Sequence, residues 1–331
     1  MHHFPAPAPA PEAGHLTLWG LTPGHDRPDI PLQGSPERCE ARAAVQDAAG
    51  RVLVLERLGP ASVARRERIG TFLHRLRQAG LPIPAPLTGP DGRIVVHGQG
   101  AHWQLSPFVP GDPLPQPDYV DQPQRGVHLG RFLGALRRAG TGSHEFDGES
   151  GFSLPAYIDA LMTTIGQRQP NLYRTLTPVM AAIAPLAEAW AGLDTAPCHG
   201  DFHPGNVIWH GHGVAAVIDW EFAGHRPVLY DAANCLGCVG MEDPAALVRG
   251  LAPALLCTLR DEECLPPPAL ALLPETVLAL RMAWLSEWLR RDDRSMIDLE
   301  VRFMRLLANS LDTLLPAWRT ILDAGSGSTV Y

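Results

Sequence analysis

Four polar residues near the middle of the chain combine types and spacing that suit catalysis. His199, Asp201 and Asn206 stand on one segment rich in glycine and proline, which favour tight turns. The apolar run 214–218 follows and ends on Asp219, which predicts a short buried strand with a carboxylate at its tip. The segment thus offers one carboxylate to accept a proton, and two hard oxygen donors of the kind that Mg²⁺ prefers.

The order of these residues resembles the catalytic loop and the metal-binding aspartate of protein kinases. Asn206 follows Asp201 by five positions, as in the motif H-R-D-x-x-x-x-N, and Asp219 takes the place of the D-F-G aspartate. The resemblance implies phosphoryl transfer. Asp201 would accept the proton of a substrate hydroxyl, while Asn206 and Asp219 would hold Mg²⁺ between the nucleotide phosphates. His199 is expected to brace the loop.

The wider sequence resembles the aminoglycoside phosphotransferase superfamily, which includes choline, homoserine and fructosamine kinases. Its signature H-G-D-hydrophobic-H-x-x-N appears as HGDFHPGN at 199–206, and hydrophobic-I-D-W/F-E appears as VIDWE at 217–221. Downstream, PVLYDAA at 227–233 resembles P-x-x-Y/W-D-L-A, so Asp231 is expected to support the catalytic loop. The Trp-Glu pair after Asp219, in place of Phe-Gly, favours small-molecule kinases over protein kinases.

This resemblance implies both the reactants and the fold. The donor would be ATP with one or two Mg²⁺. The acceptor would be a hydroxyl of a small molecule of the aminoglycoside, amino alcohol, homoserine or sugar class, with Glu221 close to it. The fold class would be α+β, protein-kinase-like and bilobal, with an antiparallel sheet and one helix in the small N-terminal lobe and a larger, mainly helical C-terminal lobe. The expected divisions are a disordered lead-in at 1–15, a nucleotide-binding lobe at 16–109 that ends in the hinge, and a catalytic and substrate lobe at 110–325.

The hydrophobic pattern agrees with that arrangement. Residues 39–47 and 52–58 predict two strands joined by a turn, and 62–79 predicts an amphipathic helix. Two segments that begin at Asp91 and Ala101 predict the last strands of a five-stranded sheet. Helices are predicted further along the chain at 126–139, 179–191, 275–291 and 297–315.

The chain contains no lysine, and all 27 of its basic residues are arginines. Kinases of this shape place a lysine on the third strand, where it holds the α- and β-phosphates and pairs with a glutamate from a helix. Here that position falls near Glu56. Strand alternation turns the neighbouring Arg57 to the opposite face, so Arg38 or Arg42 is expected to bind the phosphates instead. Glu67 is either the helix carboxylate of this arrangement or a solvated surface charge.

Two further segments are candidates for nucleotide contacts. Gly34 and Ser35 begin a possible phosphate loop, although the segment is not a G-x-G-x-x-G motif. Residues 107–111, PFVPG, resemble the hinge E-F-V-P-G of the family. Pro107 keeps its C=O and Val109 its N–H, which are the two groups that adenine needs. The same residues are also compatible with a proline-rich linker that binds no ligand.

Aromatic and acidic residues near the C-terminus are candidates for acceptor binding. Trp284 and Trp288 are four positions apart on a predicted helix and therefore share a face. They would form either an aromatic wall for the substrate or part of the core. Glu287 lies beside them and would attract a cationic substrate.

Composition narrows the class of protein. The net charge of −8 argues against nucleic acid as the main partner, and no apolar run approaches the 18 residues of a membrane span. The N-terminus lacks the apolar stretch of an export signal, so a cytoplasmic location is expected, with no membrane partner and no obligate protein partner. Cys235 and Cys238 form a C-x-x-C, which is interpreted as two core residues rather than a metal or redox site.

Two other functions remain open from the sequence. The histidines and aspartate of His199-x-Asp201-x-His203, with His210 and His212, would suit a metal-dependent hydrolase that binds zinc. The missing lysine would suit a pseudokinase-like regulator that binds nucleotide without turnover.

Overall fold

The small lobe is built on a five-stranded antiparallel sheet with the strand order β1-β2-β3-β5-β4. The computed structural model describes residues 9–34, 38–149 and 151–325. A turn at Gly50, whose φ is +83°, joins β2 to β3 where the sequence predicts it. The strands are β1 (Pro23–Asp26), β2 (Ala41–Asp47), β3 (Val52–Leu58), β4 (Val96–Gly98) and β5 (Ala101–Pro107).

A short 3-10 helix, η1 (Ala13–Trp19), closes one face of this sheet. Leu16 is fully buried, and the ring of His15 lies 4.1 Å from that of Trp103 on β5. The lead-in expected at 1–15 is therefore too long at its C-terminal end. Apolar side chains anchor η1 to the sheet, and the ordered part of the lobe begins before residue 16.

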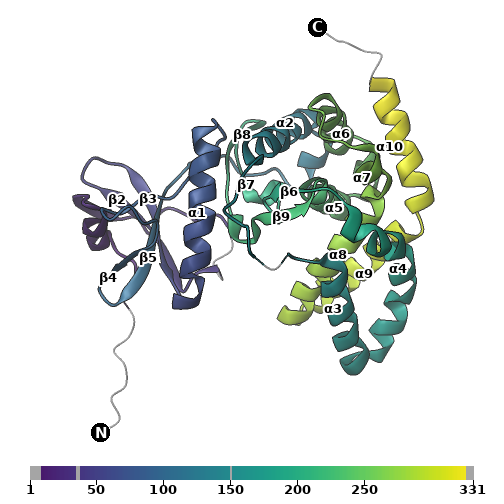
Figure 1. Ribbon diagram of the computed structural model, residues 1–331, viewed down its shortest axis with the longest axis horizontal. Coiled ribbons are helices and arrows are strands. Elements are labelled where there is room, and N and C mark those ends of the chain that lie inside the picture. Colours follow the sequence, from purple (N-terminus) through teal and green to yellow (C-terminus); the bar gives the residue numbers. More distant parts are fainter. Residues whose placement is uncertain (1–8, 35–37, 150, 326–331) are drawn as a thin grey trace.

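The helix of the small lobe, α1 (Val63–Gln78), packs toward the large lobe. Its buried residues, including Phe72 and Leu76, belong to the core of the large lobe and not to the smaller core under η1. Phe72 meets Trp220 edge to face at 6.2 Å. Figure 1 shows α1 standing between the sheet and the helical lobe.

The large lobe is mainly helical and holds two small two-stranded antiparallel sheets, β6 with β9 and β7 with β8. Its helices are α2 (Pro123–Gly140), α3 (Leu154–Arg168), α4 (Pro170–Ala189), α5 (Tyr230–Glu242), α6 (Leu251–Asp261), α7 (Pro267–Ala271), α8 (Leu273–Arg291), α9 (Arg294–Ala308) and α10 (Leu311–Gly325). Its strands are β6 (Thr195–Cys198), β7 (Val207–His210), β8 (Gly213–Val217) and β9 (Gly224–Pro227). Another short 3-10 helix, η3 (Pro60–Ser62), lies in the small lobe between β3 and α1. Further ones lie in the large lobe: η4 (Asp118–Asp121), η5 (Trp190–Gly192), η6 (Pro204–Asn206), η7 (Trp220–Phe222) and η8 (Pro244–Val248).

The helix predicted at 297–315 is in fact two helices, α9 and α10. Asp293 caps the start of α9 by accepting a hydrogen bond from the Met296 N–H at 3.1 Å. Ser310 ends the run: its hydroxyl donates to the Leu306 C=O, and its own C=O accepts from Leu314 N–H in the next helix. Polar side chains that bond nearby backbone groups break helices in this way.

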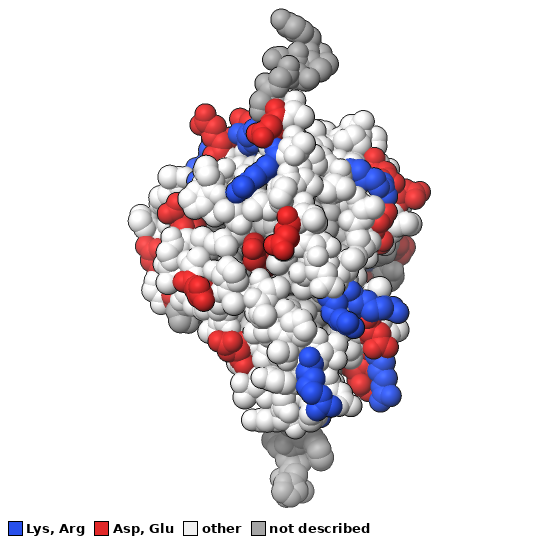
Figure 2. All heavy atoms as spheres, turned by 90° about the vertical axis from the view of Figure 1, so that its right-hand side faces the viewer, with Lys and Arg blue, Asp and Glu red and all other residues white. Residues whose placement is uncertain are grey.

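The antiparallel sheet and the helical second lobe confirm the α+β bilobal fold. Among the helices in the described part of the chain, none has the length and apolar character needed to cross a bilayer. Figure 2 shows one face of the molecule, the one at the right-hand side of Figure 1. Acidic and basic side chains are interspersed there and are not gathered into a field of one sign.

Candidate active site

The segment between β6 and β7 carries His199, Asp201 and Asn206, and a buried carboxylate holds its start. Asp231, in the first turn of α5, accepts hydrogen bonds from the backbone N–H groups of His199 (2.7 Å) and Gly200 (2.8 Å). Burial raises the pKa of Asp231 to about 6, although the two N–H bonds oppose the rise. Its position is the one expected of a residue that supports the loop.

His199 ties this loop to the strand that delivers Asp219. The side chain is fully buried, and its Nε2 lies 2.7 Å from the C=O of Ile218. Its Nδ1 accepts the Asp201 N–H at 3.1 Å, which requires the neutral tautomer protonated on Nε2. Burial accordingly lowers the pKa of His199 to about 4. His199 thus braces two catalytic segments at once.

Asp201 and Asn206 are joined within the loop. The Asn206 side-chain amide donates to the Asp201 C=O at 2.9 Å and to Asp201 Oδ2 at 3.2 Å. The Asn206 C=O in turn accepts the Ile218 N–H at 3.0 Å. Asp219 follows with φ +66° and ψ +48°, a left-handed conformation that non-glycine residues seldom adopt and that concentrates at functional sites. The structure therefore brings Asp201, Asn206 and Asp219 together.

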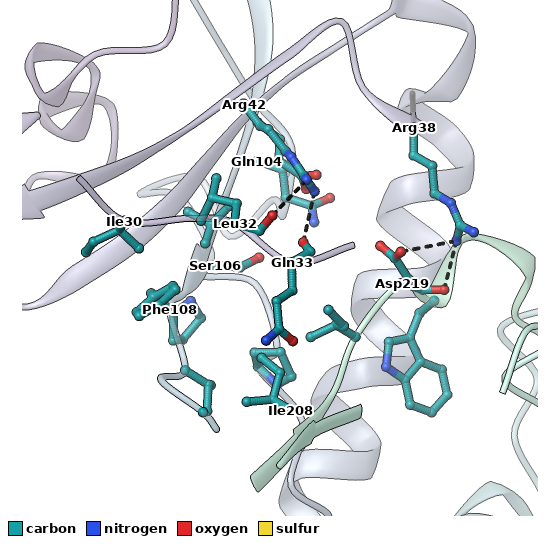
Figure 3. Close-up of a pocket in the computed structure, with 18 of the residues that line it drawn as sticks. Ile30, Leu32, Gln33, Arg38, Arg42, Gln104, Ser106, Phe108, Ile208 and Asp219 are labelled. Carbon is teal, nitrogen blue, oxygen red and sulfur yellow. Dashed lines mark hydrogen bonds and ion pairs between the residues drawn. The ribbon is translucent and has the colours of Figure 1, made fainter. Parts of the chain in front are cut away.

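Arg38 lies among the carboxylates of this site. Its guanidinium donates to Asp201 Oδ2 at 2.8 Å and to the backbone C=O of Asp219 at 3.1 Å, and lies 3.4 Å from Glu221. In Figure 3, dashed lines join Arg38 to Asp219 on the side of the view opposite Ile30 and Phe108. Three acidic side chains, those of Asp201, Asp219 and Glu221, therefore surround one guanidinium. Arg38 thus lines the cavity, and its guanidinium contacts the acids of the large lobe.

A cavity of about 570 Å³ opens beside Asp219, between the two lobes. This volume is typical of sites for small ligands and cofactors. Its walls are mainly apolar and come from the sheet, α1, the hinge and the large lobe. The lining includes Ile30, Leu32, Val54, Glu56, Arg66, Ile69, Leu73, Gln104, Ser106, Pro107, Phe108, Val109, Ile208, Asp219 and Glu221.

The hinge residues Pro107, Phe108 and Val109 line this cavity. Phe108 N–H donates to the Val52 C=O at 3.1 Å, so residue 108 faces β3 across the ladder. In an antiparallel pair the groups of the flanking residues point the other way. By this alternation the Pro107 C=O points away from β3, while Val109 lies past the end of β5 at Pro107.

Arg42, on β2, holds the loop at 32–34, whose Gly34 lies against Asp219. The Arg42 guanidinium donates to the backbone C=O groups of Leu32, Gln33 and Gly34, as Figure 3 shows for part of this set. Gly34 has φ +87°, and a Cβ atom there would lie 2.8 Å from Asp219 Oδ1. Arg42 thus braces the loop. Ser35, the other residue predicted in it, lies outside the described residues.

Three other charged residues of the small lobe, Arg57, Glu67 and Arg66, have partners that the sequence alone did not identify. Arg57 pairs with Glu40 at 3.1 Å and does not line the cavity, as strand alternation predicts. Of the two roles considered for Glu67, the phosphate-side carboxylate is wrong. Glu67 instead accepts hydrogen bonds from the N–H groups of residues 94 and 95, because α1 turns it toward the segment before β4. Arg66 lies 3.5 Å from Glu56 and was missed from the sequence. The acidic residue at position 56 could have predicted it, because a carboxylate on the strand in place of lysine favours a basic partner on the helix.

On the large-lobe side, one tryptophan reaches the catalytic loop. The Trp284 indole N–H donates to Asn234 Oδ1 at 3.2 Å, and the Asn234 amide lies 3.4 Å from Asp201 Oδ1. Trp288 instead donates to the buried Glu300. Glu287 bonds to Arg290 and Arg291 at the end of α8, so its charge is already matched. The hydrogen bonds of Trp288 and Glu287 thus lead away from the catalytic loop.

The zinc site of the hydrolase interpretation does not form. Both ring nitrogens of His199 are engaged by backbone groups, and the side chain of His210 is 89% exposed. Within residues 9–34, 38–149 and 151–325, no three His, Cys, Asp or Glu side chains are grouped to hold a metal ion. Cys235 is fully buried, and burial raises the pKa of Cys238 to about 12. Cys235 therefore packs as an apolar group, while Cys238 Sγ lies 3.9 Å from Arg281 Nη1.

Comparison with known proteins agrees with this geometry. A profile of the phosphotransferase enzyme family matches residues 39–267. The chain is 29% identical to a homoserine kinase of Gluconacetobacter diazotrophicus over 190 residues. This aligned region covers 54% of this chain and 55% of that protein. It is 28% identical over 169 residues to stress response kinase A of Salmonella typhi, covering 48% of each. The matched region thus spans about half the length of these relatives.

Solved structures share the fold at low sequence identity. A microcompartment-associated aminopropanol kinase superposes with a TM-score of 0.64 and 18% identity, covering 91% of this chain and 97% of that one. Amicoumacin kinase hAmiN, in complex with AMP-PNP, Ca²⁺ and Ami, superposes with a TM-score of 0.62 and 16% identity, covering 84% and 90%.

Proposed function

The chain belongs to the phosphotransferase enzyme family, and we propose that it transfers the γ-phosphate of ATP to a hydroxyl group of a small molecule. One observation carries the proposal. The Asp201 carboxylate, Asn206 and Asp219 are held together beside an interlobe cavity that is lined by the hinge residues Pro107 and Val109.

Asp201 is proposed as the catalytic base. Its Oδ2 bonds to Asn206 and Arg38, at 3.2 Å and 2.8 Å, whereas its Oδ1 has only longer contacts, at 3.4 Å to Asn234 and 3.9 Å to His203. Oδ1 is therefore the oxygen better placed to accept the proton of an acceptor hydroxyl. Orientation of that hydroxyl, together with removal of its proton, is what phosphoryl transfer asks of a protein side chain.

Asn206 and Asp219 are proposed to hold one or two Mg²⁺ with the nucleotide phosphates. Their side chains supply the amide and carboxylate oxygens that fit this ion, and the acid-rich surroundings of Arg38 show that the site favours positive charge. When bound, the ion neutralises charge that develops on the phosphate oxygens. The residues of the chain then fix the metal ligands and the base relative to each other through the Ile218–Asn206 backbone bond.

The acceptor is proposed to belong to the aminoglycoside, amino alcohol, homoserine or sugar class. Relatives and structural neighbours include proteins named homoserine kinase and aminopropanol kinase. On this chain His203 Nε2 lies 3.9 Å from Asp201 Oδ1, and the His203 ring lies 5.5 Å from that of Trp284. An aromatic and an acidic group side by side suit a hydroxylated amine.

The test is ATP turnover against a panel of hydroxylated amines, homoserine, aminoglycosides and sugars, with and without Mg²⁺. Turnover of at least one acceptor, abolished by chelator, supports the proposal. Stabilisation by ATP·Mg²⁺ without turnover of any acceptor would instead favour the pseudokinase-like regulator. Absence of both nucleotide binding and turnover would remove both.

A further inference from the structure

An ion pair in the wall of the cavity has its two charges exchanged relative to kinases that carry a lysine on the third strand. Glu56 stands on the central strand β3, between Arg42 of β2 and Gln104 of β5 in register. Arg66 stands on α1, and its Nη1 lies 3.5 Å from Glu56 Oε2. Both residues line the cavity, and their side chains are only 18% and 13% exposed. The acid is on the strand and the base is on the helix.

The arginines at positions 38, 42, 51 and 57 of the small lobe have other partners. Arg42 donates to three backbone C=O groups of the loop at 32–34, and Arg38 contacts the acids of the large lobe. Arg51 pairs with Asp47, and Arg57 with Glu40, away from the cavity. Arg66 donates through Nη2 to the Arg38 C=O at 2.8 Å, so it also holds the start of the segment that carries Arg38.

We propose that Arg66 is the residue that binds the nucleotide phosphates, with Glu56 as the carboxylate that positions it. The proposal rests on the proposed function, because it needs ATP in the interlobe cavity. The guanidinium has five N–H donors in a planar fork, so it can keep Glu56 on one edge and receive phosphate oxygens on another. Glu56 without Arg66 would repel the phosphates, which explains why the two charges occur together.

The experiment is a charge-swap cycle read out by ligand binding. Affinity for AMP-PNP·Mg²⁺ and for adenosine is measured by calorimetry for the wild-type protein, Arg66→Glu, Glu56→Lys and the double variant. Arg66→Glu places two carboxylates on the phosphate side, so we expect AMP-PNP·Mg²⁺ affinity to fall by about tenfold or more. Adenosine has no phosphates, and its affinity should stay within about threefold. The double variant restores a strand lysine and a helix glutamate and should recover most of the lost affinity.

A control variant has the same change of charge on the same helix. Arg77→Glu lies in the exposed last turn of α1 and does not line the cavity. It should bind both ligands as the wild type does, which shows that net charge alone is not the cause.

The outcomes separate this inference from the proposed function. A wild-type protein that binds neither ligand would overturn the proposed function itself. Wild-type binding that Arg66→Glu leaves unchanged would overturn the role of Arg66. Equal loss of adenosine and AMP-PNP·Mg²⁺ would show a structural role and overturn it as well. Failure of the double variant to recover would overturn the pairing with Glu56.

Discussion

Arg38 Nη2 lies 2.8 Å from Asp201 Oδ2, a contact between residues 163 positions apart in the chain. The same guanidinium reaches Asp219 and Glu221. It therefore compensates the carboxylates of the site when no other cation is present. A metal ion bound with nucleotide would compete with Arg38 for these same oxygens.

Replacement of Arg38 by methionine should strengthen the binding of Mg²⁺ alone. The change removes one positive charge within a few ångströms of the carboxylates, which is worth on the order of 1 kcal/mol in a partly solvated site, or about fivefold in affinity. Titration of Mg²⁺ by calorimetry measures it. Arg57→Met, which removes an arginine paired outside the cavity, is the control. Equal Mg²⁺ affinity in Arg38→Met and wild type would show that Arg38 does not compete for the site.

Asp201→Asn should abolish turnover and leave nucleotide binding nearly intact. The amide keeps the shape of the side chain and cannot accept the acceptor's proton, so kcat should fall by about 10²-fold or more. Steady-state kinetics and AMP-PNP affinity measured on the same preparation test this. Activity that survives within a few fold would assign the base to another residue.

Asp219→Ala should raise the Mg²⁺ concentration needed for nucleotide binding more than Asn206→Ala does. Both changes remove an oxygen ligand, but only Asp219 carries a charge toward the metal. The Mg²⁺ dependence of AMP-PNP affinity is the measurement. A dependence that does not move in Asp219→Ala would exclude this residue as a ligand.

Gly34→Ala should impair ATP use through contact with Asp219. The new Cβ would lie 2.8 Å from Asp219 Oδ1, and the residue has φ +87°. Gly80→Ala is a matched control, because Gly80 has φ +88° and a Cβ added there would have no atom within 4 Å. Both variants should lose about 1 kcal/mol of stability from the backbone strain. Only Gly34→Ala should raise KM for ATP, and equal kinetics in the two would contradict the close approach.

The stability of the fold should fall in mild acid because of His199. An unfolded imidazole binds its proton near pH 6.5, whereas burial lowers the pKa of His199 to about 4. Between these values the unfolded state binds more protons, so the free energy of unfolding decreases as the pH drops, by up to about 3 kcal/mol.

Denaturant unfolding at a series of pH values tests this with His199→Gln. The variant should be less stable at pH 7, since it loses hydrogen bonds, and should show a shallower decrease between pH 6.5 and 4. Asp231, whose pKa is raised to about 6, contributes the opposite slope in both proteins and therefore cancels in the comparison. His210→Gln removes an exposed histidine and serves as the control. Parallel curves for wild type and His199→Gln would refute the assignment.

The sequence predicted the parts of the site that depend on local spacing. The catalytic loop, the strand before Asp219 and the hinge lie where their patterns place them, because each is set by short-range turn and strand geometry. The chemical roles of these residues stay predictions until they are measured. The direction of Glu67 was wrong because a one-residue step on a helix rotates a side chain by about 100°, and the sequence does not show which face meets the sheet.

Contacts between distant segments were the part that the sequence could not supply. Arg42 and Arg38 are both close to the cavity, yet one bonds to backbone C=O groups and the other to carboxylates of the large lobe. That division depends on how the lobes meet. The pairing of Glu56 with Arg66 has the same origin, since it joins a strand to a helix across the fold.

The packing of α1 on the large lobe changes where the molecule is expected to bend. The side chains of Phe72 and Leu76 share the large core, whereas the sheet has its own small core under η1. A movement of the sheet relative to α1 would change the contact between Glu56 and Arg66, which joins the two elements beside the hydrogen bonds of Glu67 to residues 94 and 95. The distance between Glu56 Oε2 and Arg66 Nη1 would therefore report how far the sheet has moved from α1.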